Sequence, residues 1–284
     1  MREVVKRSRV VAGLALVVLG GSLSIPLSAQ LPFTSAKASG DSVSPAYEGW
    51  YRNPDGTYTL SFGYYNRNTN EVVEIPIGKN NFVSPGAPNQ GQPSEFQPRR
   101  NWGVFGVKVP ADFGKKEVVW TLTFRDVTYA IPGSLHQNWQ IDALEGEAGS
   151  GNTPPALRFS ESGAEGRGPF GITEGPVAAT AGKPVALTVW AKDDGKGATS
   201  VASSGRGTPA PVTLAWFKHQ GPGKVAFEPA TGRIAAAGGQ ATSNATFGAP
   251  GEYVVRVRAN DSAVAGAGHA QCCWTNGFLK VTVK

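Results

Sequence analysis

Alternation of apolar and polar residues with a period of two recurs along this chain, and it constrains the fold more than any other feature. Residues 57–65 place Tyr and large apolar side chains on one face and small or polar side chains on the other, and residues 118–124 repeat the pattern. Such runs are typical of half-buried strands. The 37 Gly and 21 Pro follow no period and separate many short segments. The sequence therefore predicts an all-β protein.

Shifts in composition divide the chain into regions. A length of 284 residues favours two domains. After a polar segment at 30–45, the strand pattern of residues 46–145 predicts a first β-sandwich, with the polar stretch 84–100 outside its core. Residues 146–172 are rich in Gly and Pro and indicate a mobile linker. Residues 173–284 show about seven strands at regular spacing, which predicts a second sandwich.

Short motifs in the second region follow one another in a recognisable order. They are Leu-Ala-Trp at 214–216, Gly-Pro-Gly at 221–223, Val-Ala-Phe at 225–227, Ala-Thr-Phe at 245–247, Ala-Pro-Gly-Glu-Tyr at 249–253 and Val-Arg-Val-Arg-Ala-Asn-Asp at 255–261. In this order they resemble the PKD-like and immunoglobulin-like modules of bacterial secreted and surface proteins. The resemblance implies a sandwich with Trp216 as its central buried aromatic residue and Tyr253 as a tyrosine corner, whose hydroxyl reaches back to the backbone.

The resemblance departs from the usual immunoglobulin pattern in one respect. Val189 and Val255 stand near the positions of the usual cysteine pair, so apolar packing is expected to replace that bridge. The first region is expected to be an immunoglobulin- or fibronectin-like sandwich too, but by its strand pattern alone. The expected fold is therefore two tandem immunoglobulin/fibronectin-like β-sandwiches after an export signal.

The N-terminus predicts export. Basic residues precede an apolar run at 10–27, which ends in the small residues Ser28 and Ala29, and this order is typical of a signal peptide at 1–29. An uncleaved membrane anchor is the alternative, because the run is almost long enough to span a bilayer. Pro26 disfavours a spanning helix. Cleavage removes four positive charges and one negative, which lowers the formal charge from +6 to +3. No nucleic-acid partner is expected at that charge.

Adjacent aromatic residues in the first region suggest a binding platform. Trp50 precedes Tyr51, and Tyr64 precedes Tyr65. Neighbouring side chains on a strand point to opposite faces, so one member of each pair is expected at the surface. Trp50, Tyr51 and Tyr65 are therefore candidates for a platform on which a sugar ring could stack. Packing at an edge or between domains is the alternative.

Cys272 and Cys273 are the only cysteines, and they are adjacent. Cysteines usually pair in an oxidising compartment, but neighbouring Cα atoms lie only ~3.8 Å apart across a trans peptide. A vicinal disulfide therefore requires a turn before the last strand; two separate thiols and inter-chain bridges remain open. His269 stands near the pair, but His136 and His219 come from distant segments, so solvated histidines are expected rather than a zinc site.

Asp193, Asp194 and Asp261 fall in loops that could meet at one end of the second sandwich. Grouped carboxylates there could hold calcium, which prefers six to eight oxygen ligands. Aspartates that form turns are the ordinary alternative. No other cofactor is expected.

The sequence lacks the common catalytic motifs: a nucleophile elbow, a His-Glu-x-x-His helix and a phosphate-binding loop. We therefore expect an exported, non-catalytic structural or interaction module in the periplasm, at the cell surface or in the medium. Its expected partner is a cell-envelope protein or polysaccharide, with no membrane span after signal cleavage. A carbohydrate-binding protein and an accessory polysaccharide-degrading enzyme are the alternatives.

Overall fold

The computed structural model describes residues 37–145, 151–196, 211–261 and 271–284. The signal peptide expected at 1–29 lies outside the described residues, as does His269. The described chain is all-β, apart from one short 3₁₀ helix, η1 (Gln137–Trp139). This part of the chain contains no helix with the length and hydropathy needed to cross a bilayer.

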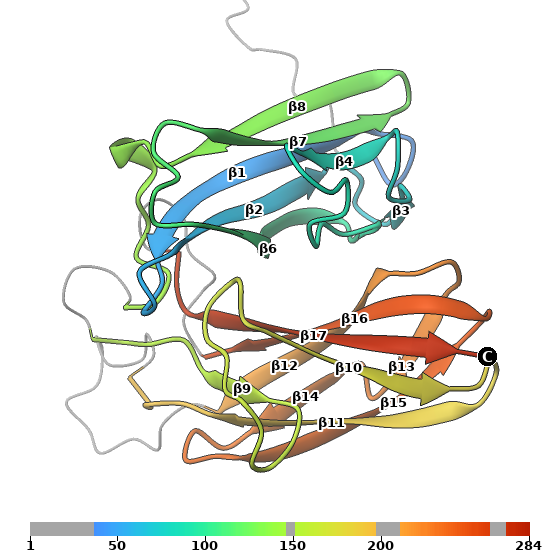
Figure 1. Ribbon diagram of the computed structural model, residues 1–284. Coiled ribbons are helices and arrows are strands. Elements are labelled where there is room, and N and C mark those ends of the chain that lie inside the picture. The colour runs from blue at the N-terminus through green and yellow to red at the C-terminus, as the bar shows by residue number, and fades with distance from the viewer. Residues whose placement is uncertain (1–36, 146–150, 197–210, 262–270) are drawn as a thin grey trace, which may run out of the picture. The chain divides into compact units, whose positions relative to one another are not determined.

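The first sandwich packs two three-stranded antiparallel sheets face to face (Figure 1). One sheet has the order β1-β2-β6, and the other has the order β4-β7-β8; β3 and β5 form a separate short pair. The bounds are β1 (Val43–Arg52), β2 (Tyr58–Asn66), β3 (Val73–Glu74), β4 (Asn81–Ser84), β5 (Glu95–Phe96), β6 (Arg99–Val109), β7 (Glu117–Phe124) and β8 (Val127–Ser134). The alternating runs 57–65 and 118–124 are therefore strands, as expected.

Aromatic rings fill the core of the first sandwich. Phe62 stacks on Phe105 at a centroid distance of 5.3 Å, and Trp120 meets Phe105 edge-on at 5.0 Å. Burying a Trp requires a partner for its N–H, and Trp120 Nε1 donates to Asn81 Oδ1 at 3.0 Å. Phe96 is fully buried in the same core. The expectation that residues 84–100 lie outside the core is therefore wrong at Phe96, because a single large apolar side chain anchors an otherwise polar segment.

The second sandwich has the strand arrangement of an immunoglobulin-like fold (Figure 1). Its sheets have the orders β10-β17-β16-β12-β14 and β13-β15-β11-β9. The bounds are β9 (Ala156–Arg158), β10 (Ile172–Ala179), β11 (Pro184–Lys192), β12 (Val212–Gln220), β13 (Val225–Glu228), β14 (Thr231–Ile234), β15 (Gly239–Phe247), β16 (Gly251–Asn260) and β17 (Trp274–Val283). Consecutive strands switch sheets at two edges: β9 pairs with β11 but β10 with β17, and β13 pairs with β15 but β14 with β12.

Residues expected to organise the second core do so. Trp216 is buried, and the Tyr253 hydroxyl donates to the Ala249 carbonyl at 2.8 Å, as a tyrosine corner does. Val189 and Val255 are buried in one apolar cluster, where packing takes the place of an inter-sheet disulfide. These contacts confirm the immunoglobulin-like arrangement, whereas the PKD-like assignment stays a prediction.

Two of the expected region boundaries are wrong. Val43 is buried in β1, so the first sandwich begins inside the polar segment assigned to 30–45. The expected linker at 146–172 supplies β9, whose Leu157 is fully buried in the second core. A linker composition hid this strand, because only three residues of it pair with β11.

Candidate ligand-binding sites

A buried ion pair joins the second sandwich to the first; both lie in one compact unit. Lys218 of β12 has a side chain only 2% exposed, and its Nζ lies 2.7 Å from Glu74 Oε1 and 3.0 Å from Glu95 Oε2. Glu74 and Glu95 face each other across the β3–β5 pair. Burial lowers the pKa of Lys218, but its hydrogen bonds to the two carboxylates outweigh burial and raise the pKa overall. The ammonium group is therefore charged and fully paired.

The chain on both sides of Lys218 continues this contact. The Ser94 N–H donates to the His219 carbonyl at 2.8 Å, and Gln220 Nε2 donates to the Gln92 carbonyl at 2.6 Å. His219 Nε2 lies 2.7 Å from the Gly91 carbonyl oxygen. Burial lowers the pKa of His219 to about 3, with help from the charge of Arg256. The expectation of solvated histidines is therefore wrong for His219, which is buried, neutral and structural.

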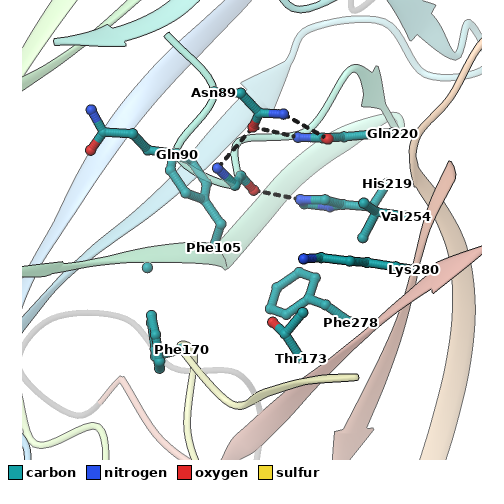
Figure 2. Close-up of a pocket in the computed structure, with 12 residues that line it drawn as sticks. Asn89, Gln90, Phe105, Phe170, Thr173, His219, Gln220, Val254, Phe278 and Lys280 are labelled. Carbon is teal, nitrogen blue, oxygen red and sulfur yellow. Dashed lines mark hydrogen bonds between the residues drawn. The ribbon is translucent and has the colours of Figure 1, made fainter. Parts of the chain in front are cut away.

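Gly91, His219 and Gln220 line one side of a cavity of 340 Å³, which we call the amide pocket (Figure 2). Asn89 and Gln220 pair through their side-chain amides, with both N···O distances at 3.1 Å. Phe170 lies on the opposite side of the pocket in Figure 2. The pocket is lined by Asn89, Gln90, Gly91, Phe105, Gly106, Phe170, Thr173, His219, Gln220, Val254, Phe278 and Lys280. Several side-chain amides line the pocket. The amides of Asn89 and Gln220 are hydrogen-bonded to each other.

A second contact between the sandwiches lies where side chains of β17 reach backbone carbonyl groups of β6 and of the segment before β10. Asn276 Nδ2 donates to the carbonyls of Gly103 at 2.7 Å and Pro169 at 2.8 Å, and the Trp274 indole N–H donates to Gly103 at 3.3 Å. A Cβ atom at Gly103 would collide with the Trp274 ring, and Gly103 has a φ of +45°. Glycine is therefore required where β6 meets β17.

A second candidate site lies beside β1 and η1. Two adjoining hollows of 380 Å³ and 640 Å³ share Tyr47, Asn138 and Trp139, and together we call them the tryptophan groove. The inner hollow is also lined by Glu48, Arg100, Trp102, Gln140, Ile141 and Gln271. The outer hollow is also lined by Ala46, Glu117, Ile131, Pro132, Ser134 and His136. Both volumes lie within the usual range of ligand sites.

Glu48 lies at the inner end of the groove and is only 4% exposed. Its Oε2 accepts from Arg100 Nη2 at 2.7 Å. Burial raises the pKa of Glu48 to about 7, although Arg100, Gly103 and Gln271 all act in the opposite direction. Within the described residues, Glu48 Oε1 and Gln271 Oε1 have no partner at hydrogen-bonding geometry. The groove therefore contains two buried side-chain oxygens without a geometric partner, one of them on a carboxyl group that can hold a proton near neutral pH.

Aromatic side chains dominate the open part of the groove. Trp139 is 50% exposed, and its ring lies 5.6 Å from that of Tyr47. The Arg100 guanidinium lies 3.8 Å from the centroid of Trp102 and covers that ring. Sequence reasoning missed Trp139, although a tryptophan within the polar run Gln-Asn-Trp-Gln at 137–140 is a poor fit to a core strand.

The platform expected from Trp50, Tyr51 and Tyr65 does not form. Tyr51 is only 4% exposed, and its hydroxyl accepts from the Phe170 N–H at 3.0 Å. Trp50 is half-buried and donates through Nε1 to the His136 carbonyl at 2.8 Å. Tyr65 is half-buried beneath two guanidinium groups.

Strand register also separates the two tyrosines. Tyr51 lies opposite Thr59, whereas Tyr65 lies opposite Ser44 at the other end of β1. At about 3.3 Å per residue, the distance from Ser44 to Tyr51 along β1 is roughly 20 Å, too far for both to contact one sugar ring. Packing against the second sandwich, the alternative raised from the sequence, accounts for Tyr51.

Cys272 and Cys273 are joined by a vicinal disulfide in the structure, directly before β17. Their Cα atoms lie 3.0 Å apart across a cis peptide bond, and both side chains are buried. Gln271, which lines the tryptophan groove, immediately precedes the pair, and Trp274, which contacts Gly103, immediately follows it. The pair therefore lies between a residue that lines the groove and a residue that holds the two sandwiches together.

The carboxylates considered for calcium accept hydrogen bonds from nearby chain instead. Asp194 Oδ2 accepts from the Thr153 hydroxyl at 3.0 Å, Asp193 Oδ2 accepts from the Gly195 N–H at 2.8 Å, and Asp261 Oδ2 accepts from Asn152 Nδ2 at 2.8 Å. Among the described residues, no group of three or more His, Cys, Asp or Glu side chains is placed to hold a metal ion. The hypothesis of a calcium site therefore lacks a cluster of ligands in that part of the chain.

Comparisons with known proteins place the chain in no family: no family model matches it, and no curated protein matches it. Among solved structures, the D00-D0 domain of intimin is 12% identical and covers 85% of this chain and 100% of its own, with a TM-score of 0.26. Domains 4 and 5 of the S-layer protein SbsC are 12% identical to this chain. The match covers 86% of this chain and 98% of those domains, with a TM-score of 0.24. The adhesin InvE of Yersinia pseudotuberculosis is 12% identical to this chain. The match covers 84% of this chain and 58% of the InvE chain, with a TM-score of 0.25.

Likenesses with TM-scores this low carry no argument about the function of this chain. The fold class rests on its own strand order: two tandem β-sandwiches, the second of them immunoglobulin-like.

Proposed function

We propose that this chain is an exported, non-catalytic interaction module that acts in the periplasm, at the cell surface or in the medium. The observation that carries the proposal is the buried contact between the sandwiches, in which Lys218 pairs with Glu74 and Glu95. A buried ion pair with all partners in place fixes one arrangement of the groups around it. Two sandwiches held in this way present their surfaces to a partner together, which suits a binding or structural role.

The chemistry of the described residues supports a non-catalytic role. His219 is buried and neutral, so it is poorly placed to act as a general base, and His136 caps η1 by accepting from the Asn138 N–H at 3.3 Å. A glycosidase of the common type needs two facing carboxyl groups. Two carboxyl groups of the described residues line the tryptophan groove: Glu48, which Arg100 pairs, in the inner hollow, and Glu117 in the outer hollow, so they do not share one hollow.

The proposal is tested by co-sedimentation of the purified mature protein with isolated cell envelope and with insoluble polysaccharides. We expect saturable sedimentation with the envelope. A protein that stays in the supernatant with every preparation would contradict the proposal. Release of soluble sugars from any of these preparations would instead support the degradative enzyme considered from the sequence.

A carbohydrate-binding role is the second candidate, and one observation favours it. Trp139 exposes half of its surface next to the buried acceptors of Glu48 and Gln271. An exposed indole beside hydrogen-bonding groups is a usual composition for a ligand site.

A further inference from the structure

We propose that the tryptophan groove binds a chain of pyranose sugars, with Trp139 as the stacking platform and Glu48 and Gln271 as hydrogen-bonding partners for sugar hydroxyls. The inference rests on the proposed function, since it names a site and a ligand class for an interaction module. It replaces the platform of Trp50, Tyr51 and Tyr65 with a different set of residues, of which Trp139 comes from outside any strand.

The aromatic side chains supply the first argument. The face of an indole carries negative charge density, and the C–H groups on the face of a pyranose ring carry partial positive charge, so the two surfaces attract. Trp139 is half exposed and lines both hollows, so a chain lying along the groove passes over it. Tyr47 extends the aromatic surface, with a ring plane tilted by 54° from that of Trp139.

The unpaired acceptors supply the second, independent argument. Glu48 and Gln271 are each only 4% exposed and line the inner hollow, and each has a buried side-chain oxygen without a partner among the described residues. A buried acceptor without a donor destabilises the fold. A sugar hydroxyl is both a donor and an acceptor, so it can satisfy the Gln271 oxygen and either protonation state of Glu48.

The backbone around Trp139 is fixed before any ligand arrives. Trp50 and Gln140 form a β-bridge, and the Ile141 N–H donates to the Trp50 carbonyl at 2.9 Å. A Cβ atom at Gly49 would collide with the Trp139 carbonyl oxygen, so glycine at this position lets η1 approach β1. A site held in place by its scaffold loses less entropy when a ligand binds.

The inference is tested with soluble cello-oligosaccharides, chito-oligosaccharides and glycan-strand fragments of peptidoglycan. Binding to the mature protein is measured by titration calorimetry and by tryptophan fluorescence. We expect at least one of these probes to bind, and Trp139→Ala to weaken that binding about tenfold or more. Trp139→Phe should recover part of the affinity, because it keeps an aromatic face.

Phe170→Ala is the matched control, because Phe170 is also exposed but lines the amide pocket. It should leave sugar affinity unchanged, and thermal unfolding should be alike for both alanine variants. Glu48→Gln, which keeps an acceptor and removes the charge, tests the inner hollow separately and should weaken binding less than Trp139→Ala does.

Two outcomes would overturn the inference: no binding of any of the three probes, or binding that Trp139→Ala and Phe170→Ala affect equally. Envelope co-sedimentation of Trp139→Ala separates this failure from failure of the proposed function. If the variant still sediments with the envelope while no sugar binds, the interaction module stands and its sugar site falls. If neither the variant nor the wild type sediments and no sugar binds, both proposals fall.

Discussion

The amide pocket and the tryptophan groove are both lined by aromatic and polar side chains, yet their polar groups are in opposite states. In the amide pocket, Asn89 pairs with Gln220, and His219 pairs with the Gly91 carbonyl. In the groove, Glu48 and Gln271 each keep an oxygen without a partner among the described residues. Since burying an unpaired polar group is costly, the first arrangement stabilises the fold and the second is suited to a ligand.

The comparison also separates two uses of buried charge. Lys218 is enclosed by two carboxylates and fastens one sandwich to the other. Glu48 has a single cation, Arg100, whose side chain is 26% exposed, and burial dominates its titration. Lys218, paired with two carboxylates, stabilises the contact between the sandwiches. Glu48, paired with one cation, has a pKa near neutral, so its charge changes with pH.

Removing Lys218 should have the largest effect on stability. Lys218→Ala leaves Glu95, 13% exposed, and Glu74, 48% exposed, without their cation; because water screens Glu74, the loss should fall below the about 3–5 kcal/mol of a fully buried pair. Urea unfolding of the variant and the wild type measures the difference. Lys108→Ala is the control: its pair with Asp55 is exposed, so its loss should leave the urea unfolding midpoint almost unchanged. Equal effects of the two substitutions would refute the structural role of the buried pair.

The neutral His219 should make stability depend on acid pH. Its pKa is lowered by burial from 6.5 to about 3, so between these values the unfolded chain binds a proton that the folded chain does not. Stability from this group is therefore complete above pH 6.5 and is lost as the pH falls toward 3. Unfolding free energies measured across this range should decline less steeply in His219→Gln. Parallel curves for the variant and the wild type would show that His219 titrates normally.

Glu48 should act in the opposite sense over an overlapping range. Its pKa is raised by burial from 4.5 to about 7, so the folded chain binds the extra proton and stability falls as the pH rises between these values. Glu48→Gln should remove this fall. The effect should be smaller than that of His219, because the pKa of Glu48 moves less. If Glu48→Gln instead steepens the loss of stability with rising pH, the carboxyl is stabilised in its charged form and the contrast between the two sites disappears.

Reduction of the disulfide should have the smallest effect on stability of the changes considered. It should affect the tryptophan groove and not the amide pocket. Gln271 precedes the disulfide and lines the groove, so reduction should change the fluorescence of Trp139; the signal of Trp274, which follows the pair, is subtracted by repeating the measurement on Trp139→Phe. Alkylation followed by mass spectrometry should add nothing to the native protein and two groups after reduction. Labelling without reductant would show that the cysteines are separate thiols, and a covalent dimer would show an inter-chain bridge.

Local patterns predicted most of the strands, because alternation and turn residues act over a few positions. The tyrosine corner was predictable for the same reason: Tyr253 and its acceptor Ala249 are four residues apart. Tyr51 was misplaced because its hydroxyl is buried against Phe170, 119 residues away, and nothing near Tyr51 in the sequence records that contact. β9 was hidden in a Gly- and Pro-rich stretch for a related reason, since its three residues are held by pairing with β11.

The candidate site was the least predictable part. Its principal residues come from β1, β6, η1 and the segment before β17, and only the fold brings Glu48, Arg100, Trp139 and Gln271 together. The unpaired oxygens that argue for a ligand are a property of three-dimensional packing and leave no mark in the sequence. The kind of ligand could be anticipated from the abundance of aromatic residues in the first region, but the residues that would hold it could not.

The prolines at the margins of the sheets have a consequence for crowding. Pro45 lies in β1, Pro132 in β8 and Pro176 in β10, and each of these strands is at the edge of its sheet. Proline has no N–H to offer a neighbouring strand. The edges at β9, β13 and β14 are only three or four residues long. At high protein concentration these edges should therefore have little tendency to pair with strands of other copies and form fibrils.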